Sequence, residues 1–137
     1  MVRVQLQVIN AMVEHAVREE PLESCGLLTR RDEVIDGIQP CSNERRSPVR
    51  FDISPRELLD FFRRLREEDT HFAGIYHSHP QTSPVPSQTD IDNFHYPGVS
   101  YWIISLASDE PTAACFEWSG GDFVRAGYAI SGMEQAS

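Results

Sequence analysis

The sequence contains no lysine, and all twelve of its basic residues are arginine. Against them stand 21 acidic residues, which give the 137-residue chain a formal net charge of −9. Non-specific binding to nucleic acids depends on Lys and Arg side chains that neutralise phosphates, and binding to anionic membranes depends on similar basic clusters. The charge balance therefore predicts a protein that binds neither nucleic acid nor membrane. Codon bias and a high-salt cytoplasm would each produce this composition.

Cysteine and long apolar runs are also scarce. The three cysteines, Cys25, Cys41 and Cys115, are an odd number without paired spacing, which favours a reducing, cytoplasmic location over a disulfide framework. No run approaches the roughly 18 apolar residues of a membrane-spanning helix, and residues 1–10 lack the pattern of a secretory signal. No repeat or linker is visible, so we expect a single domain over residues 1–137.

Hydrophobic periodicity predicts two main helices. Leu6, Ile9 and Val13 begin an apolar face in a helix expected over Gln5–Glu20, which Pro21 ends. The sequence Ser54-Pro55-Arg56-Glu57 has the pattern of a capping box with proline at the first helical position, and it predicts a second helix that continues to about Glu68.

The remaining apolar segments are short and predict strands. We expect strands at Ser24–Thr29, Val34–Ile38, Val49–Ile53, Phe72–His77, Ser100–Ala107, Ala113–Trp118 and Phe123–Ile130, a polar loop at Asn43–Pro48 and a short helix from about Ser87. Polar and glycine turns predict hairpins between the first two strands and between the last two. Strands and helices do not alternate strictly, which favours an α/β sandwich with a mixed, mainly antiparallel sheet flanked by two main helices.

One segment carries residues suited to metal chemistry. Side chains two positions apart in a strand share a face, so His77 and His79 can present two imidazoles to one point. Asp90, near the start of the short helix, can supply a third ligand. Two histidines, one aspartate and an open position are the ligands of a catalytic zinc site, in which the metal lowers the pKa of a water molecule to about 7.

Such a site also needs a general base and an oxyanion stabiliser, for which Glu23 and Ser87 are candidates. Each residue alone has a simpler explanation. Asp90 could be an acidic residue that the helix dipole favours, and Ser87 could be the N-cap of the helix, or have both roles. Spacing alone does not select Glu23 over Glu19 or Glu20.

These residues together resemble a known family. The string His77-Ser78-His79-Pro80, six residues, Ser87, two residues and Asp90 is similar to the complete JAMM motif of the MPN+ metallopeptidases. The segment from Pro21 to Leu28 is similar to the family's segment around its catalytic glutamate. The resemblance implies an MPN-like fold that binds one zinc ion per chain through His77, His79 and Asp90, with Glu23 as the general base and Ser87 as the oxyanion stabiliser.

The compact chain resembles the bacterial branch that processes small ubiquitin-like sulfur-carrier proteins. The resemblance implies hydrolysis after a C-terminal Gly-Gly, with release of cysteine or another adduct. Two other functions remain open: a non-catalytic MPN interaction module, against which the intact ligand set argues, and a nucleic-acid-associated JAMM protein, against which the acidic balance argues.

Other residues have structural explanations at this point. We expect Cys25 to be a small buried residue and Ser78 to point away from the two histidines. His15, His71 and His95 are expected at the surface or in packing, as are Trp102 and Trp118. The arginines Arg45, Arg46 and Arg50 form a basic stretch that is either a solvated loop or a contact for an acidic carrier surface.

Overall fold

The computed structural model describes residues 1–93 and 96–131. Along these residues the elements follow in the order β1 (Val2–Gln5), α1 (Leu6–Glu19), β2 (Cys25–Arg30), β3 (Val34–Cys41), α2 (Pro55–Glu68), β4 (His71–His79), α3 (Gln88–Asp92), β5 (Ser100–Ser105), β6 (Thr112–Ser119), β7 (Asp122–Ala126) and β8 (Tyr128–Ser131). Both predicted helices and the short helix after Ser87 are present.

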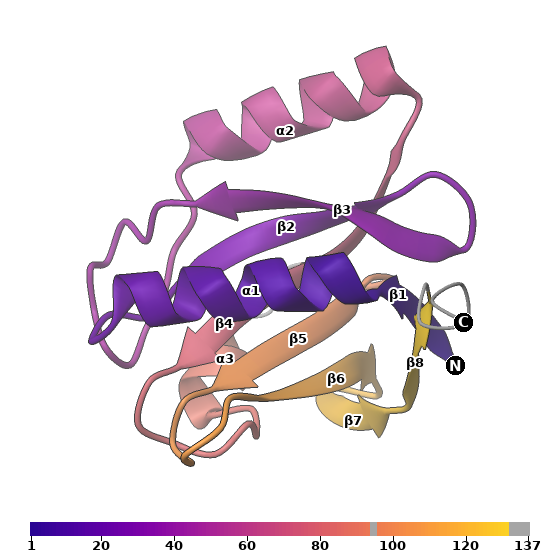
Figure 1. The fold of residues 1–137 in the computed structure, drawn as a ribbon. Helices are drawn as coiled ribbons and strands as arrows, with labels where there is room; N and C mark the ends of the chain where they lie inside the picture. Colours follow the sequence, from indigo (N-terminus) through magenta and orange to yellow (C-terminus); the bar gives the residue numbers. More distant parts are fainter. Residues whose placement is uncertain (94–95, 132–137) are drawn as a thin grey trace.

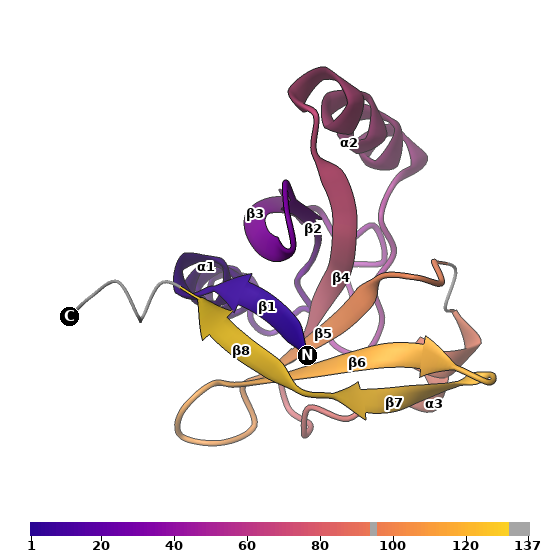
Figure 2. The same cartoon turned by 90° about the vertical axis from the view of Figure 1, so that its right-hand side faces the viewer.

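All eight strands form one sheet in the order β7-β6-β5-β4-β2-β3-β1-β8. The pairs β1–β3, β1–β8 and β4–β5 are parallel, and the other neighbours are antiparallel. Strands β7 and β8 lie at opposite ends of this order, yet only Gly127 separates them in the chain. The sheet therefore curls strongly (Figures 1 and 2). The predicted α/β class with a mixed, mainly antiparallel sheet is confirmed, although the sheet is curled rather than flat.

The two helices pack on opposite faces of this sheet. Helix α1 lies on the inner face, where Val8 and Met12 are buried together with Tyr76 and Trp102 of the central strands. Helix α2 covers the outer face, where Phe61 is buried in a second cluster of apolar residues. Full burial of one such large side chain stabilises a fold by roughly 1.5–3 kcal/mol, so the two clusters hold both helices to the sheet.

Strand β4 lies at the centre of the sheet, between β2 and β5. Its residues Ile75, His77 and His79 share a face, because side chains alternate along a strand, and Ile75 belongs to the α2-side cluster. Helix α3 connects β4 to its parallel neighbour β5. In α/β sheets, ligands bind beyond the carboxyl ends of such parallel strands, and the carboxyl end of β4 is where the two histidines lie.

Three sequence predictions need correction. Residues Val49–Ile53 do not form a strand, because their backbone groups bond to the side chain of Asn43 and not to another strand. Strand β1 was not predicted, since its partners β3 and β8 are distant in sequence. The single strand expected over Phe123–Ile130 is divided at Gly127 into β7 and β8, which pair at opposite edges of the sheet.

The start of α2 is as predicted, but only half of the capping box forms. The Ser54 side chain accepts a hydrogen bond from the backbone N–H of Glu57 (3.1 Å). The carboxylate of Glu57 accepts instead from the backbone N–H of Ser42, at 3.2 and 3.3 Å. This contact ties the first turn of α2 to the end of β3.

Among the described residues, no helix is both long enough and apolar enough to span a membrane.

The close packing of Gly26 against Tyr76 generates a stability prediction. A Cβ atom at Gly26 would overlap the Tyr76 ring, which is buried and whose hydroxyl lies 2.7 Å from Nδ1 of His15. Gly26→Ala should therefore lower the free energy of unfolding by about 1–3 kcal/mol, the usual cost of overpacking a core. The melting temperature, followed by circular dichroism, should fall by about 5–10 °C.

Gly127→Ala is the matched control, because its Cβ would lie at an ordinary 3.6 Å from the Met1 side chain. Its melting temperature should stay within about 2 °C of the wild type. Equal melting temperatures for the two variants would contradict the packing argument.

Candidate metal centre

The end of β4 places two imidazoles side by side on the outer face of the sheet. The Nε2 atoms of His77 and His79 lie 3.2 Å apart, and both side chains are buried. Ser78 points to the other face, where its hydroxyl accepts a hydrogen bond from the backbone N–H of Ser24 (2.8 Å). The strand alternation expected from the sequence therefore persists to His79.

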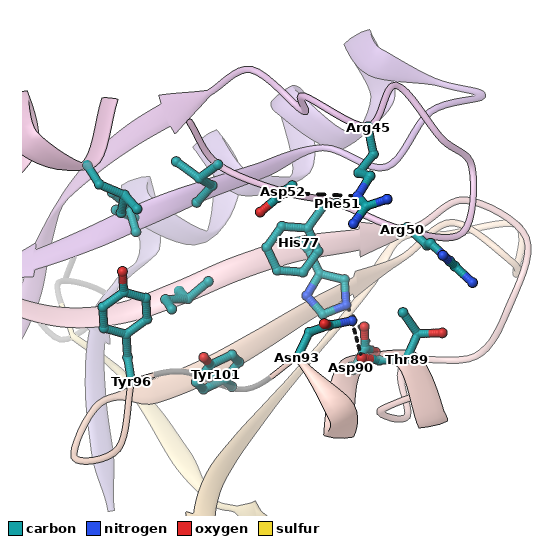
Figure 3. A pocket seen from close by; sticks show the side chains of 14 residues that line it. Arg45, Arg50, Phe51, Asp52, His77, Thr89, Asp90, Asn93, Tyr96 and Tyr101 are labelled. Carbon is teal, nitrogen blue, oxygen red and sulfur yellow. Dashed lines mark hydrogen bonds and ion pairs between the residues drawn. The ribbon is translucent and has the colours of Figure 1, made fainter. Parts of the chain in front are cut away.

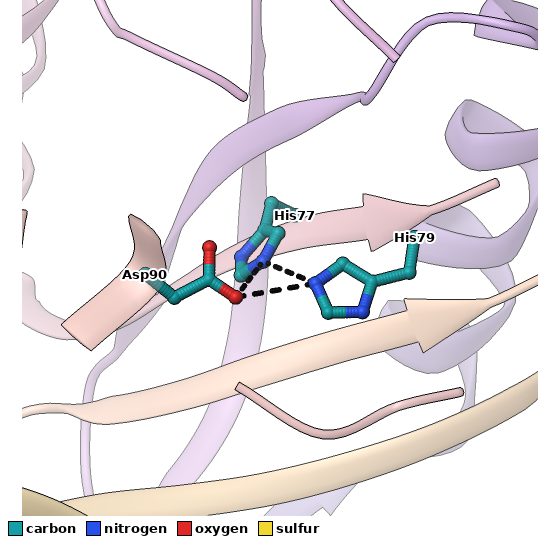
Figure 4. A group of neighbouring side chains, drawn as sticks. All are labelled: His77, His79 and Asp90. Carbon is teal, nitrogen blue, oxygen red and sulfur yellow. Dashed lines mark hydrogen bonds and ion pairs between the residues drawn. The ribbon is translucent and has the colours of Figure 1, made fainter. Parts of the chain in front are cut away.

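Asp90 reaches the same point from the first turn of α3 (Figure 4). Its Oδ2 atom lies 3.2 Å from Nε2 of His77 and 3.2 Å from Nε2 of His79. The same oxygen accepts a hydrogen bond from the backbone N–H of Ser87 (2.9 Å), while the Ser87 hydroxyl accepts from the N–H of Asp90 (3.1 Å). Ser87 and Asp90 thus form a complete capping box, which fixes the carboxylate opposite the histidines.

The three ligand atoms have the spacing of a tetrahedral metal site. Zinc binds His nitrogen and carboxylate oxygen at about 2.0–2.2 Å, which places tetrahedral ligand atoms about 3.3 Å from one another. The 3.2 Å separations of His77, His79 and Asp90 match this value, and these three residues form a group that could hold a metal ion. Three protein ligands leave one position open, as in catalytic sites.

The two histidines are supported differently. Nδ1 of His79 lies 2.8 Å from the backbone carbonyl oxygen of Ser83, to which its N–H donates when Nε2 is free to bind a metal. Nδ1 of His77 is buried and has no hydrogen-bond partner among the described residues. The His77 ring instead stacks on Phe51, with ring centroids 4.7 Å apart and planes inclined by 21°.

The electrostatics of this group favour an ionised Asp90. Burial by itself raises the pKa of the Asp90 carboxyl, but the two imidazoles and the Ser87 N–H outweigh burial and hold that pKa well below its usual range. For His79, burial lowers the pKa, while the bonds to Asp90 and Ser83 and the charge of Asp90 raise it by more. This cluster of His77, His79 and Asp90 therefore contains one ionised carboxylate, which suits the binding of a metal cation.

Glu23 lies next to this cluster, just before β2. The β2–β4 register pairs Cys25 with His77, and the backbones of Ser24 and Ser78 are hydrogen-bonded. The next step of this register places Glu23 across from His79, and residues opposite one another on neighbouring strands share a face. Glu23 is buried, and its Oε1 has no hydrogen-bond partner among the described residues. Burial, aided by the charge of Asp90, raises its pKa to about 8, although His79 opposes this.

The other expectations have mixed outcomes. Cys25 is fully buried, as expected, and burial raises the pKa of its thiol. His15 is a buried packing residue bonded to Tyr76, and His71 is exposed. Trp102 is fully buried and Trp118 is half-buried. His95 lies outside the described residues.

A cavity of about 400 Å³ adjoins the cluster (Figure 3). Its apolar wall is formed by Leu27, Ile53, Leu58, Ile75, Tyr96 and Tyr101. His77 and Asp90 lie at its edge, together with the side chains of Arg45 and Arg50. Sequence reasoning missed Phe51 as the neighbour of His77, because Phe51 was placed in a strand. The Asn residue at the start of the polar loop was the available signal, since Asn side chains commonly organise turns.

Burial of Glu23 without a hydrogen-bond partner generates a pH prediction for the metal-free protein. The folded chain binds the Glu23 proton up to about pH 8, whereas the unfolded chain releases it near the ordinary value of 4.5. The free energy of unfolding should therefore fall as pH rises from about 4.5 to 8. Glu23→Gln removes this loss, so urea unfolding at pH 5, 6.5 and 8 should show the variant gaining stability over the wild type as pH rises.

Glu20→Gln is the matched control, since Glu20 is an exposed carboxylate at the end of α1. Its stability should follow the wild type across this range. A Glu23→Gln curve parallel to the wild type would show that burial does not act on Glu23 as described.

Comparisons with known proteins identify the family of the chain. Residues 5–119 match the family model described as prokaryotic homologs of the JAB domain. The desampylase of Haloferax volcanii is 30% identical over 120 residues, which cover 85% of this chain and 84% of that protein. The CysO-cysteine peptidase of Mycobacterium tuberculosis is 33% identical over 104 residues, or 74% of this chain and 71% of that one. A solution structure from Desulfitobacterium hafniense superposes with a TM-score of 0.86 and 31% identity, covering 96% of this chain and 93% of its own. The chain therefore belongs to the family of prokaryotic homologs of the JAB domain.

Proposed function

We propose that this protein is a zinc-dependent peptidase that hydrolyses the bond after the C-terminal Gly-Gly of a small ubiquitin-like sulfur-carrier protein, with release of cysteine or another adduct. One observation carries the proposal. Three atoms that can bind a metal, from His77, His79 and Asp90, lie 3.2 Å from one another, and the buried carboxylate of Glu23 lies beside them. The names of two relatives, a desampylase and a CysO-cysteine peptidase, support the substrate class. Three free cysteines agree with a cytoplasmic location.

In this proposal, His77, His79 and Asp90 bind one zinc ion per chain. Bound zinc acts as a Lewis acid that polarises a carbonyl group and lowers the pKa of water to about 7. The Ser83 carbonyl holds His79 with its Nε2 directed at Asp90. The two imidazoles and the Ser87 N–H keep the Asp90 carboxylate ionised, and the capping box fixes its position.

Glu23 acts as the general base and then as the general acid. One carboxylate oxygen takes the proton of the attacking water and passes it to the amine that leaves with the adduct. Its surroundings suit this task, because burial shifts its pKa toward neutrality, where a group both accepts and releases a proton efficiently.

Ser87 stabilises the oxyanion that forms on the attacked carbonyl. Its Oγ already accepts a hydrogen bond from the N–H of Asp90, which leaves the hydroxyl hydrogen free to donate. Ser87 is exposed, so a substrate can reach it. The N-cap and the oxyanion roles are therefore compatible in one side chain.

The activity test uses a ubiquitin-like carrier that ends in Gly-Gly and carries a C-terminal cysteine adduct. Wild type with one equivalent of zinc should release the adduct, as read by mass spectrometry, and chelation should stop the reaction. Glu23→Ala should retain zinc and lose about 10²–10⁴-fold in kcat, the usual contribution of a general base. His79→Ala should lose zinc as well.

Glu20→Ala is the control and should cleave at the wild-type rate. Cleavage that survives chelation would refute the zinc mechanism. A wild-type protein that binds no metal would favour the non-catalytic interaction module.

Two arginines at the edge of the cavity lead to a prediction about how the carrier protein docks. Arg45 and Arg50 line the cavity beside His77 and Asp90, whereas the chain as a whole carries a charge of −9. We expect these arginines to attract an acidic surface of the carrier. Arg50→Glu should raise KM about 3–10-fold at low salt with little change in kcat, and the difference should shrink as salt screens the charges.

Arg31→Glu makes the same charge change in the β2–β3 turn, at the far end of these strands from His77. It should leave KM near the wild-type value. Equal effects of the two substitutions would show that net charge, and not the cavity edge, governs docking.

A further inference from the structure

The loop between β3 and α2, residues 42–54, has no regular secondary structure, and the side chain of Asn43 makes several of the hydrogen bonds that hold it. Nδ2 of Asn43 donates to the backbone carbonyls of Arg50 (2.8 Å) and Glu23 (3.1 Å). Its Oδ1 accepts from the backbone N–H groups of Arg45 (3.0 Å) and Asp52 (3.2 Å). The carboxamide thus joins both limbs of the loop and anchors them to the residue that precedes β2.

Two of these bonds flank Phe51. The carbonyl of Arg50 and the N–H of Asp52 lie on either side of Phe51 in the chain, and both bond to the Asn43 side chain. The backbone of Asp52 is held a second time, because its carbonyl accepts from the N–H of Glu44 (2.9 Å). Asn43 therefore fixes the peptide groups that determine where the Phe51 ring points.

The Phe51 ring points at His77 (Figure 3). The two rings are stacked at 4.7 Å with their planes inclined by 21°. A histidine that binds a metal through one nitrogen is usually held by a hydrogen bond from the other. His79 has such a bond to Ser83, but His77 has none among the described residues. Stacking on Phe51 therefore orients the His77 ring, as the hydrogen bond to Ser83 orients the His79 ring.

We propose that Asn43 is a positioning residue that acts through Phe51 to fix the orientation of the His77 ring beside His79 and Asp90. The proposal rests on the proposed function only in taking His77 as a metal ligand. A purely structural Asn43 would stabilise the loop, and its loss would lower the melting temperature without changing the orientation of His77.

The experiment uses the full chain and measures two properties: the orientation of the His77 ring in the metal-free protein, and the affinity for zinc. In the metal-free protein, the ring current of Phe51 should shift the His77 Cε1–H signal in the NMR spectrum. Asn43→Ala and Phe51→Ala should both move this signal toward the position of an unstacked imidazole, and Phe51→Tyr should restore it. Zinc affinity, measured by competition with a chromophoric chelator, should fall about 10-fold or more in both alanine variants.

A double-mutant cycle tests whether the two residues act together. If Asn43 acts through Phe51, the double alanine variant should bind zinc about as weakly as Phe51→Ala alone. The nearly isosteric Asn43→Asp removes the donors to Glu23 and Arg50 but keeps an acceptor, and it should resemble Asn43→Ala. The visible spectrum of the cobalt-substituted protein should change in the same variants.

Two controls separate positioning from stability. Val49→Ala truncates an exposed residue of the same loop and should change neither readout. Val8→Ala destabilises the α1-side core, far from the loop, and should lower the melting temperature while leaving the His77 signal and the zinc affinity unchanged.

The outcomes distinguish this inference from the proposed function. A wild-type chain that binds no zinc overturns the proposed function, while the NMR signal of the metal-free protein still decides the inference. A His77 signal that is unchanged in Asn43→Ala, or additive losses of zinc affinity in the double variant, would overturn the role of Asn43.

Discussion

The structure depends on the convergence of His77, His79 and Asp90, whose ligand atoms lie 3.2 Å apart in a largely buried place. Such a group is stable only where the surrounding elements hold each of its members in place. Strand β4 aligns the histidines by alternation, and the bond between Ser78 and Ser24 keeps that alternation to the end of the strand. Helix α3, the connection between the parallel strands β4 and β5, returns Asp90 to the same point. The curled sheet buries β4 at its centre, which gives the cluster a rigid base.

The residues of the site also serve the fold. Ser87 and Asp90 cap α3, and an N-cap of this kind stabilises a helix by about 0.5–2 kcal/mol. The Asp90 oxygen that closes the capping box also lies 3.2 Å from Nε2 of both imidazoles, so the cap that begins the helix also holds Asp90 opposite the histidines. The loop of residues 42–54 follows the same principle, since the Asn43 side chain that organises its backbone also carries Phe51 to His77. Local order and site geometry are therefore coupled.

What the sequence predicts well is local. The apolar pattern of residues 5–20 and the proline after Ser54 located both main helices, and the spacing of His77 and His79 predicted their common face. The apolar face predicted to begin at Leu6 was wrong, because Leu6 is exposed and Val8 and Met12 are buried instead. Contacts between distant segments could not be predicted in this way. Strand β1 exists only because β3 and β8 pair with it, and Val49–Ile53 is a loop because a side chain, not a strand, takes its backbone bonds. Spacing alone did not distinguish Glu23 from Glu19 and Glu20, whereas the β2–β4 register does, because it places Glu23 across from His79.

The two carboxylates of the site differ in the property that matters for proton transfer. Asp90 accepts bonds from a backbone N–H and faces two imidazoles, so its charge is stabilised and its pKa lies far below neutrality. Glu23 lies across from His79 in the β2–β4 register, but its Oε1 has no partner among the described residues, and burial raises its pKa to about 8. Environments that separate the pKa values of neighbouring acids assign them different tasks. A carboxylate that stays ionised suits a metal ligand, and one that exchanges a proton near neutral pH suits a general base. The burial that costs stability at Glu23 is thus the feature that suits it to the chemistry proposed for this site.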